Sequence, residues 1–403
     1  MTFDFDQIID RRGTNALAVE GYQNYLFGTD AESNDSVRLV LPNDGRDLIS
    51  MWVADMAFAA PPAVTDAIRE RLAHPVLGYT MNFDDKFYQA FCDWTARHYS
   101  WTFAPQDLFL STGTVPALYD LAEFACRADE HILTFTPAYG YFQHAADHHN
   151  RELKALALHR DGNRYEIDLD ALRRAAADPK ARMLFLCHPH NPTGQTWTDE
   201  QLIGIAEVCL EHDVLIVSDE VHCDLLRQNR THTPLAKLFP HSEHIVTCMA
   251  PSKTFNLAGL MLGTVIIHSE ALRKLWRRRV NPICNPLSLA AAHGVYRHGD
   301  AWLAELRTYL DHNFEYLAQR LHAELPAAGF QIPNATYMAW IDLSAYFPKD
   351  VNLTKFFIEE AGVILEGGEM FIADGGRHVR LNIACPKQTL REAIDRIVQA
   401  LEK

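Results

Sequence analysis

Short apolar runs alternate with amphipathic stretches along the middle of the chain. The apolar runs predict seven strands, at 107–111, 131–135, 152–158, 182–187, 214–218, 244–249 and 263–268. Helical patterns separate several of them, for example at 115–127 and 199–212. Near-continuous apolar strands joined by helices indicate a mostly parallel sheet covered on both faces, so we predict an α/β fold. In such sheets, ligands bind beyond the carboxyl ends of the strands.

The pattern changes after this region. Residues 286–325 read as helices, with Asn285 as N-cap and Pro286 at the first helical position. Further on, apolar and polar residues alternate as in half-buried strands at 329–332, 336–343 and 378–384, with helical patterns at 352–361 and 387–402.

Two domains follow from this division. We predict a large domain over 46–290 and a smaller α+β domain built from 1–45 and 291–403. Residues 1–45 are irregular in pattern, and we expect them to join the small domain or to contact a partner.

The composition changes this picture little. The 403 residues include 48% hydrophobic ones, and the net charge of −15 argues against a nucleic-acid partner. No apolar run approaches the ~18 residues that a membrane span needs. The start, MTFDFDQIID, lacks the features of a signal peptide, so we expect a cytoplasmic protein without membrane contact.

Cysteines and histidines give no metal motif. The eight cysteines form no C-x-x-C pair, and several lie in apolar runs, so we expect them to be reduced and buried. Histidine pairs occur at 148/149 and 241/244 without an H-E-x-x-H pattern, and we predict no metal site.

One basic run stands out in this acidic chain. Arg273, Lys274, Arg277, Arg278 and Arg279 surround Trp276. Such a run could bind phosphate, but a solvated helix face or the rim of a dimer interface is the preferred interpretation.

Chemically useful residues follow the predicted strands. Gly113 and Thr114 open a helix after the first strand, where backbone N–H groups and the helix dipole favour an anion. Tyr139 follows the second strand and could stack on a planar ligand. Asn191, before a proline, could donate to a phenolate or carboxylate oxygen. Each could equally be a turn or a packing residue.

Two charged residues complete the set. Asp219 ends an apolar strand, where its carboxylate needs a cationic partner such as a pyridinium nitrogen, unless it caps a helix. Lys253 follows the next strand, where burial would free its amine for a Schiff base, although an isolated lysine is usually a surface residue. Together the five strand ends offer the groups that hold pyridoxal 5′-phosphate (PLP).

The sequence resembles the fold-type-I PLP enzymes of the aspartate aminotransferase superfamily, and within it the MalY/PatB-type cystathionine β-lyase branch. The resemblance spans most of the chain. The segments that carry it are MWVADMAF (51–58), GYT (78–80), STGTVPAL (111–118), TPAYGYF (136–142), HNPTG (190–194), SDEVH (218–222), APSKTFNLAGL (250–260) and VRLNIACP (379–386).

For the cofactor, the resemblance implies a role for each matching residue. Lys253 would form the Schiff base, Asp219 would pair with the pyridine nitrogen, and Asn191 would bond the O3′ oxygen. His222 stands where many aminotransferases have a tyrosine near O3′, and Tyr139 would stack on the ring.

The phosphate and substrate positions are implied in the same way. Gly113, Thr114 and Ser252 would bind the phosphate. Tyr79 would act on the phosphate of a neighbouring subunit, which implies a homodimer with shared active sites. Arg380, together with Asn191, would bind the substrate carboxylate.

Some positions depart from the family pattern. Ala250 and Met261 replace a serine and an arginine that aminotransferases usually carry. Ala57 replaces an aspartate, and Ala18-Val19-Glu20 stands where the lyase-like branch often has Lys-Trp-Asp. These last changes leave the substrate's identity open.

The resemblance implies α,β-elimination on a sulfur-containing L-amino acid, such as cystathionine or a cysteine conjugate, giving thiol, pyruvate and ammonia. Two alternatives remain open: an aminotransferase that uses the same lysine, and a PLP-binding regulator that acts by protein contact. A dinucleotide-dependent dehydrogenase is excluded, because no G-x-G-x-x-G follows an early strand.

Overall fold

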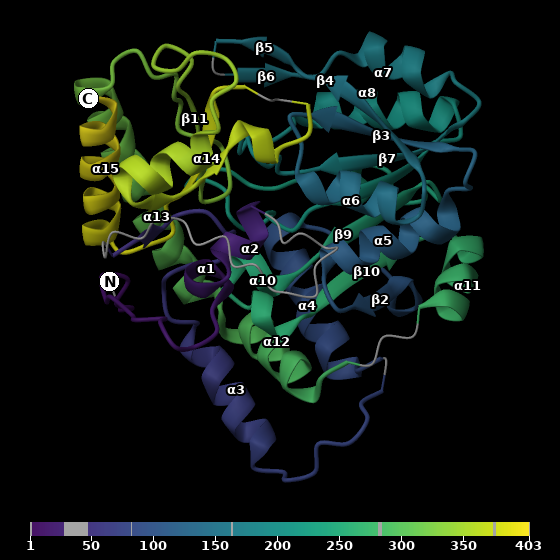
Figure 1. The fold of residues 1–403 in the computed structure, drawn as a ribbon. Coiled ribbons are helices and arrows are strands. Elements are labelled where there is room, and N and C mark those ends of the chain that lie inside the picture. Colours follow the sequence, from purple (N-terminus) through teal and green to yellow (C-terminus); the bar gives the residue numbers. More distant parts are fainter. Residues whose placement is uncertain are drawn as a thin grey trace, which may run out of the picture. The chain divides into compact units, whose positions relative to one another are not determined.

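The chain forms two compact units, each built from separate stretches of sequence (Figure 1). The computed structural model describes residues 2–27, 47–81, 83–162, 164–280, 284–373 and 376–402. Unit 1 comprises Met1–Ala59, Thr308–Pro333 and Tyr337–Lys403, and unit 2 comprises Ala60–Arg307 and Asn334–Thr336. The domain limits proposed from the sequence, before 46 and after 290, stay a prediction.

A seven-stranded sheet forms the centre of unit 2, in the order β2-β10-β9-β8-β7-β3-β4. Its strands are β2 (Leu108–Ser111), β3 (His131–Thr136), β4 (Glu152–Ala157), β7 (Ala181–Cys187), β8 (Leu215–Asp219), β9 (Ile245–Met249) and β10 (Gly263–Ile267). Only β10 runs antiparallel to its neighbours in this sheet. All residues of β3, β8, β9 and β10 are buried, as expected for a sheet covered on both faces. The seven strands and the α/β class predicted from the sequence are confirmed.

The helices of unit 2 fill most of the connections between these strands. They are α3 (Pro62–Leu72), α4 (Asp85–Tyr99), α5 (Thr114–Ala125), α6 (Gly140–His148), α7 (Leu169–Ala176), α8 (Asp199–Glu211), α9 (Leu235–Leu238), α10 (Pro251–Thr254), α11 (Glu270–Arg279), α12 (Pro286–His298) and the start of α13 (Asp300–Glu324). A small hairpin, β5 (His159–Asp161) with β6 (Arg164–Glu166), and two 3₁₀ turns, Pro105–Asp107 and Ala258–Leu260, complete the unit.

Local capping explains where two of these helices begin. The Asn285 side chain accepts from the Leu287 N–H at 2.9 Å, which confirms the predicted cap before Pro286. Thr198 and Gln201 form a reciprocal capping box at the start of α8.

None of the helices in the described part of the chain is both long and apolar enough to span a bilayer.

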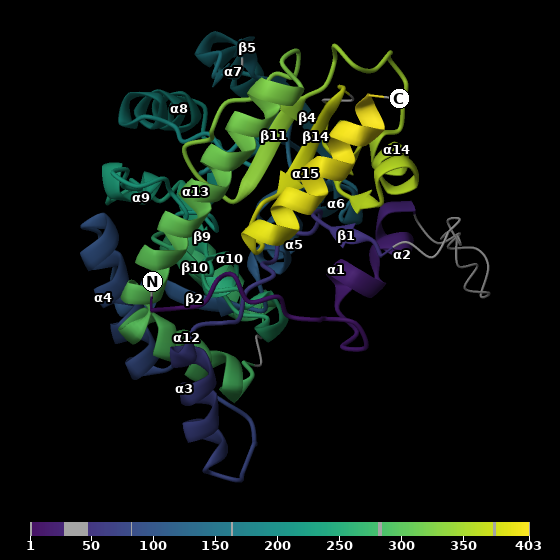
Figure 2. The same cartoon turned by 90° about the vertical axis from the view of Figure 1, so that its left-hand side faces the viewer.

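Unit 1 contains a three-stranded antiparallel sheet in the order β11-β14-β13. Figure 2 shows β11 beside β14. The elements of unit 1 are α1 (Leu17–Glu20), α2 (Tyr22–Phe27), β1 (Ile49–Ser50), the part of α13 from Thr308 onward, β11 (Met338–Asp342), α14 (Leu353–Phe356), the π-helix Phe357–Ala361, β12 (Val363–Ile364), β13 (Glu366–Gly367), the 3₁₀ turn Gly368–Met370, β14 (His378–Asn382) and α15 (Lys387–Leu401). The strand predicted at 329–332 is wrong. Only Gly329 bridges to Asp342, and Pro333, which has no N–H to donate to a ladder, follows the segment directly.

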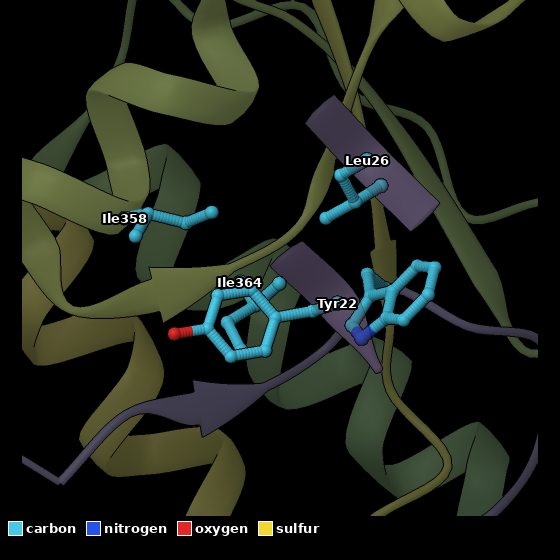
Figure 3. Packing of buried hydrophobic residues seen from close by; sticks show 5 residues of the cluster. Tyr22, Leu26, Ile358 and Ile364 are labelled. Atoms are coloured by element: carbon cyan, nitrogen blue, oxygen red, sulfur yellow. The ribbon is translucent and has the colours of Figure 1, made fainter. Parts of the chain in front are cut away.

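A small hydrophobic cluster joins the beginning of the chain to the rest of unit 1. Tyr22 and Leu26 of α2 pack with Trp52, Ile358 and Ile364 (Figure 3). The pattern of residues 1–45 predicts irregular structure, but two short helices form within them, and residues 28–45 lie outside the described part of the chain.

Candidate active site

The carboxyl ends of the central strands bring several of the predicted residues to one edge of the sheet. In the register of the ladders, Cys187 of β7 pairs with Asp219 of β8, which pairs with Cys248 of β9. The three strands therefore end at the same level. The segments that follow β7 and β9 carry Asn191 and Lys253, and Lys253 is near enough for its charge to lower the pKa of Asp219.

The turn from β2 into α5 forms an anion cradle. Gly113 is the N-cap residue, with φ of 158°, and α5 begins at Thr114. Thr114 Oγ1 is buried and has no hydrogen-bond partner among the residues described by the structure. A buried hydroxyl beside the first N–H groups of a twelve-residue helix fits a phosphate.

Gly263, which the sequence pattern did not single out, lies against this turn. A Cβ at Gly263 would lie only 2.8 Å from the carbonyl carbon of Gly113. Any side chain at position 263 would therefore displace the cradle. The signal in the sequence was a glycine at the start of a predicted strand, which often marks close approach of another backbone.

Asp219 is a buried carboxylate in an environment that suits a cationic partner. It is buried, and burial raises its pKa to about 7, against the opposing effects of the Val221 N–H and the charge of Lys253. The Val221 N–H donates to Asp219 Oδ1 at 3.2 Å. Residues 221–224 form a turn, so the alternative role of Asp219 as a helix cap is not seen. A protonated pyridine nitrogen would stabilise this carboxylate.

Lys253 lies in α10, and the residue after it anchors that turn. Thr254 Oγ1 donates to Asp224 Oδ2 at 2.7 Å. The other oxygen of Asp224 accepts from Trp94 Nε1 at 3.0 Å and from the Tyr99 hydroxyl. This buried set ties the lysine's turn to the segment after β8. Asp224 and Thr254 were not predicted, although both lie in or beside the motifs quoted above.

The loop after β7 is held by backbone contacts. The Asn191 N–H lies 3.4 Å from Cys187 Sγ, and Trp197 Nε1 donates to the Cys187 carbonyl at 3.1 Å. Asn191 is buried, as is His222 in the turn after β8. These contacts fix the backbone from which the Asn191 amide projects.

Two more predicted cofactor residues lie on neighbouring turns. Tyr139 precedes α6 and is half-buried, with its ring centroid 5.2 Å from that of Tyr141. Ser252 precedes Lys253 in α10 and is also half-buried. Both belong to unit 2, as do the cradle, Asn191, Asp219 and His222.

A buried polar cluster supports the end of β8. Glu220 accepts from Ser218 Oγ at 2.8 Å and from the Leu235 N–H at 3.1 Å, and lies 2.6 Å from His232 Nε2. Burial lowers the pKa of His232 to about 3 and that of His188, whose ring stacks near it, to about 3. Burial therefore favours the neutral form of both rings.

Two further predicted site residues belong to other segments of the chain. Arg380 is on β14 of unit 1, buried, and ion-paired with Glu366. Tyr79 lies on the loop between α3 and α4 of unit 2, and 94% of it is exposed.

The basic run and the cysteines behave as structural residues. The run forms α11, where Arg273 pairs with Asp107 and Lys274 with Glu270, and Trp276 is buried. This confirms the helical interpretation. All eight cysteines are free, and all but Cys92 are buried, as predicted.

The chain is similar to several known proteins along most of its length. A family model described as aminotransferase class I and II matches residues 46–397. Cystathionine beta-lyase PatB of Bacillus subtilis is 37% identical over 88% of this chain and 93% of its own length. Protein MalY of Escherichia coli is 29% identical over 99% of both chains. A PLP-bound C–S lyase from Staphylococcus hominis is 43% identical, with a TM-score of 0.94 over 100% of this chain and 98% of that one.

Proposed function

Because the chain belongs to the class I and II aminotransferase family, we propose that it is a PLP-dependent carbon–sulfur lyase acting on sulfur-containing L-amino acids. The observation that carries the proposal is the similarity to the PLP-bound C–S lyase of Staphylococcus hominis along the whole chain. The site residues of unit 2 fit PLP, through the anion cradle at α5 and the buried carboxylate of Asp219.

Different residues would bind different parts of PLP. The N–H groups at the start of α5, with Thr114 Oγ1 and Ser252, would bind the phosphate. Lys253 would hold the aldehyde carbon covalently, and Asp219 would keep a proton on the pyridine nitrogen. Asn191 and His222 would lie at the O3′ oxygen, and Tyr139 would cover the ring.

When bound, PLP supplies an electron sink for the negative charge left at Cα after its proton is removed. Lys253 would take that Cα proton as general base. Arg380 holds the α-carboxylate, which fixes the orientation of the Cα–H bond. Asp219 would keep a proton on the pyridine nitrogen, and its burial means that little water would screen that pair.

The overall reaction balances with water as the second reactant. With L-cystathionine, the Cβ–S bond breaks, its electrons leave with the sulfur, and water converts the remaining three-carbon fragment to pyruvate and ammonia. The thiol product is homocysteine. The test is incubation with cystathionine without any 2-oxo acid, since a lyase needs no acceptor and an aminotransferase does.

We place the active enzyme in the cytoplasm as a homodimer with shared active sites. Eight free cysteines suit a reducing compartment. The end of α3 and the loop around Tyr79 expose several large apolar side chains, which is typical of an interaction surface. These are Leu72, Val76, Leu77, Tyr79 and Met81.

Co-expression of two inactive variants tests the sharing of sites. Lys253→Ala and Tyr79→Ala are each expected to impair turnover. In the mixed dimer one of the two sites regains both residues if Tyr79 acts on its partner's cofactor, so about half of the sites in that dimer should be restored. The measurement is the specific activity of the purified mixed dimer.

The matched control pairs Lys253→Ala with Asp219→Asn, which occupy the same strand-end site. No mixed site then holds both native residues, and no activity should return. Equal activity in the two mixtures, or a monomer at assay concentration, would contradict shared sites.

A further inference from the structure

Arg380 lies in the middle of the small sheet of unit 1, with a carboxylate beside it. In register, Arg380 of β14 faces Trp340 of β11 on one side and Glu366 of β13 on the other. Directly paired residues project from the same face of a sheet. The guanidinium of Arg380 forms an ion pair with the Glu366 carboxylate and donates to the Trp52 carbonyl at 3.1 Å.

Aromatic rings surround this ion pair. The guanidinium carbon of Arg380 lies 5.1 Å from the ring centroid of Phe371, and the rings of Trp340 and His378 are stacked at 4.9 Å. Arg380 is 2% exposed and Glu366 is buried with it. Charge interactions here are much stronger than at a surface, because little water screens them.

We propose that Glu366 is an internal counter-ion that sets the affinity of Arg380 for the substrate's α-carboxylate. This inference rests on the proposed function, in which Arg380 binds that carboxylate. A guanidinium has five N–H donors arranged on more than one edge, so Arg380 can hold Glu366 and a second carboxylate together.

The charge balance gives the sign of the effect. Arg380, Glu366 and a bound carboxylate together carry a net charge of −1, whereas the same group with glutamine at 366 is neutral. Glu366 therefore weakens carboxylate binding while it keeps the guanidinium oriented. The product pyruvate is also a carboxylate, so the same effect helps it to leave.

Glu366→Gln keeps the shape of the side chain and leaves Arg380 buried without its counter-ion. A buried charge without a counter-ion raises the free energy of the folded protein, and binding of an added anion lowers that free energy again. The variant holoenzyme should bind acetate at least about tenfold more tightly than the native holoenzyme, measured by calorimetry and by the rise in Tm with acetate. Its KM for cystathionine should fall about tenfold with kcat nearly unchanged, because the gain is equal in ground and transition states.

Glu369→Gln is the matched control. Glu369 lies three residues further along the same segment, and its carboxylate accepts from the Thr354 N–H at 3.0 Å. The same loss of charge there should leave acetate affinity and KM at native values. Adding Arg380→Gln to Glu366→Gln should remove the gain in acetate affinity, since the cation is then absent.

Glu366→Asp keeps the charge and provides a second variant if the amide variant does not fold. Its shorter side chain weakens the ion pair, so acetate affinity should rise and KM should fall to a smaller extent.

Native acetate affinity in both Glu366 variants would overturn the inference. If the native enzyme nevertheless releases thiol and pyruvate, the proposed function stands and only the counter-ion role fails. Tighter acetate binding in the variants of an enzyme that does not eliminate would instead support the counter-ion role and refute the proposed function.

Discussion

Replacing Lys253 with alanine is expected to lower kcat for thiol release by about 10²- to 10⁴-fold, because the chain loses its general base at Cα. The same change removes the covalent hold on the cofactor aldehyde. The visible absorption of the purified protein should therefore change to that of non-covalently bound PLP, or disappear. Both quantities are read from one preparation, by a thiol assay and an absorption spectrum.

Lys274→Ala is the control for this prediction. Lys274 is an exposed lysine on α11 that pairs with Glu270 at 2.6 Å. Its loss should leave turnover and spectrum native. Retention of more than about a tenth of native turnover in Lys253→Ala would be incompatible with the role assigned to this amine, given the usual size of general-base effects.

Replacing Asp219 with asparagine should lower kcat/KM by roughly 10²- to 10³-fold and weaken PLP binding. The reason is that a buried cation then loses its charged partner, at a cost of several kcal/mol. Asp213→Asn is the matched control. Asp213 lies just before the other end of β8, where its carboxylate is exposed and pairs with Arg182 at 2.6 Å. Equal kinetics in the two variants would show that Asp219 does not face the cofactor.

The same variant has a pH signature in the cofactor-free protein. The pKa of Asp219 is about 7 in the folded state and about 4 in the unfolded chain. As pH rises between these values, the unfolded state gives up its proton first, so Asp219 increasingly destabilises the fold. Without PLP, Asp219→Asn should thus gain Tm relative to the native protein from about pH 4 to about pH 7. A difference that stays constant or reverses would contradict this burial effect.

The sheet and its strand-end residues could be predicted because their signals are local. A run of apolar residues indicates a buried strand, whichever strand it pairs with. Asp219 and Lys253 could be recognised because each is a charged residue at or just beyond the end of such a run. Parallel strands then bring their carboxyl ends together without further information. The error at 329–332 has the same origin, since local alternation says nothing about whether a partner strand is present.

Residues that depend on contacts between distant segments could not be found this way. Gly263 matters only because β10 pairs with β2, which places it against Gly113. Asp224 matters through Thr254, and Glu366 through its register with Arg380. None of these pairings has a periodicity or motif of its own. At Ala57 and Ala18-Val19-Glu20 the chain departs from the family pattern, and the effect of these residues can likewise be assigned only once a substrate has been tested.

The most direct test of the central claim is the stoichiometry of products from L-cystathionine with no 2-oxo acid present. We predict homocysteine, pyruvate and ammonia in equal amounts, formed continuously over many turnovers by the native holoenzyme and not by Lys253→Ala. Product that stops after one turnover per site and resumes only when a 2-oxo acid is added would contradict the claim, and would identify an aminotransferase.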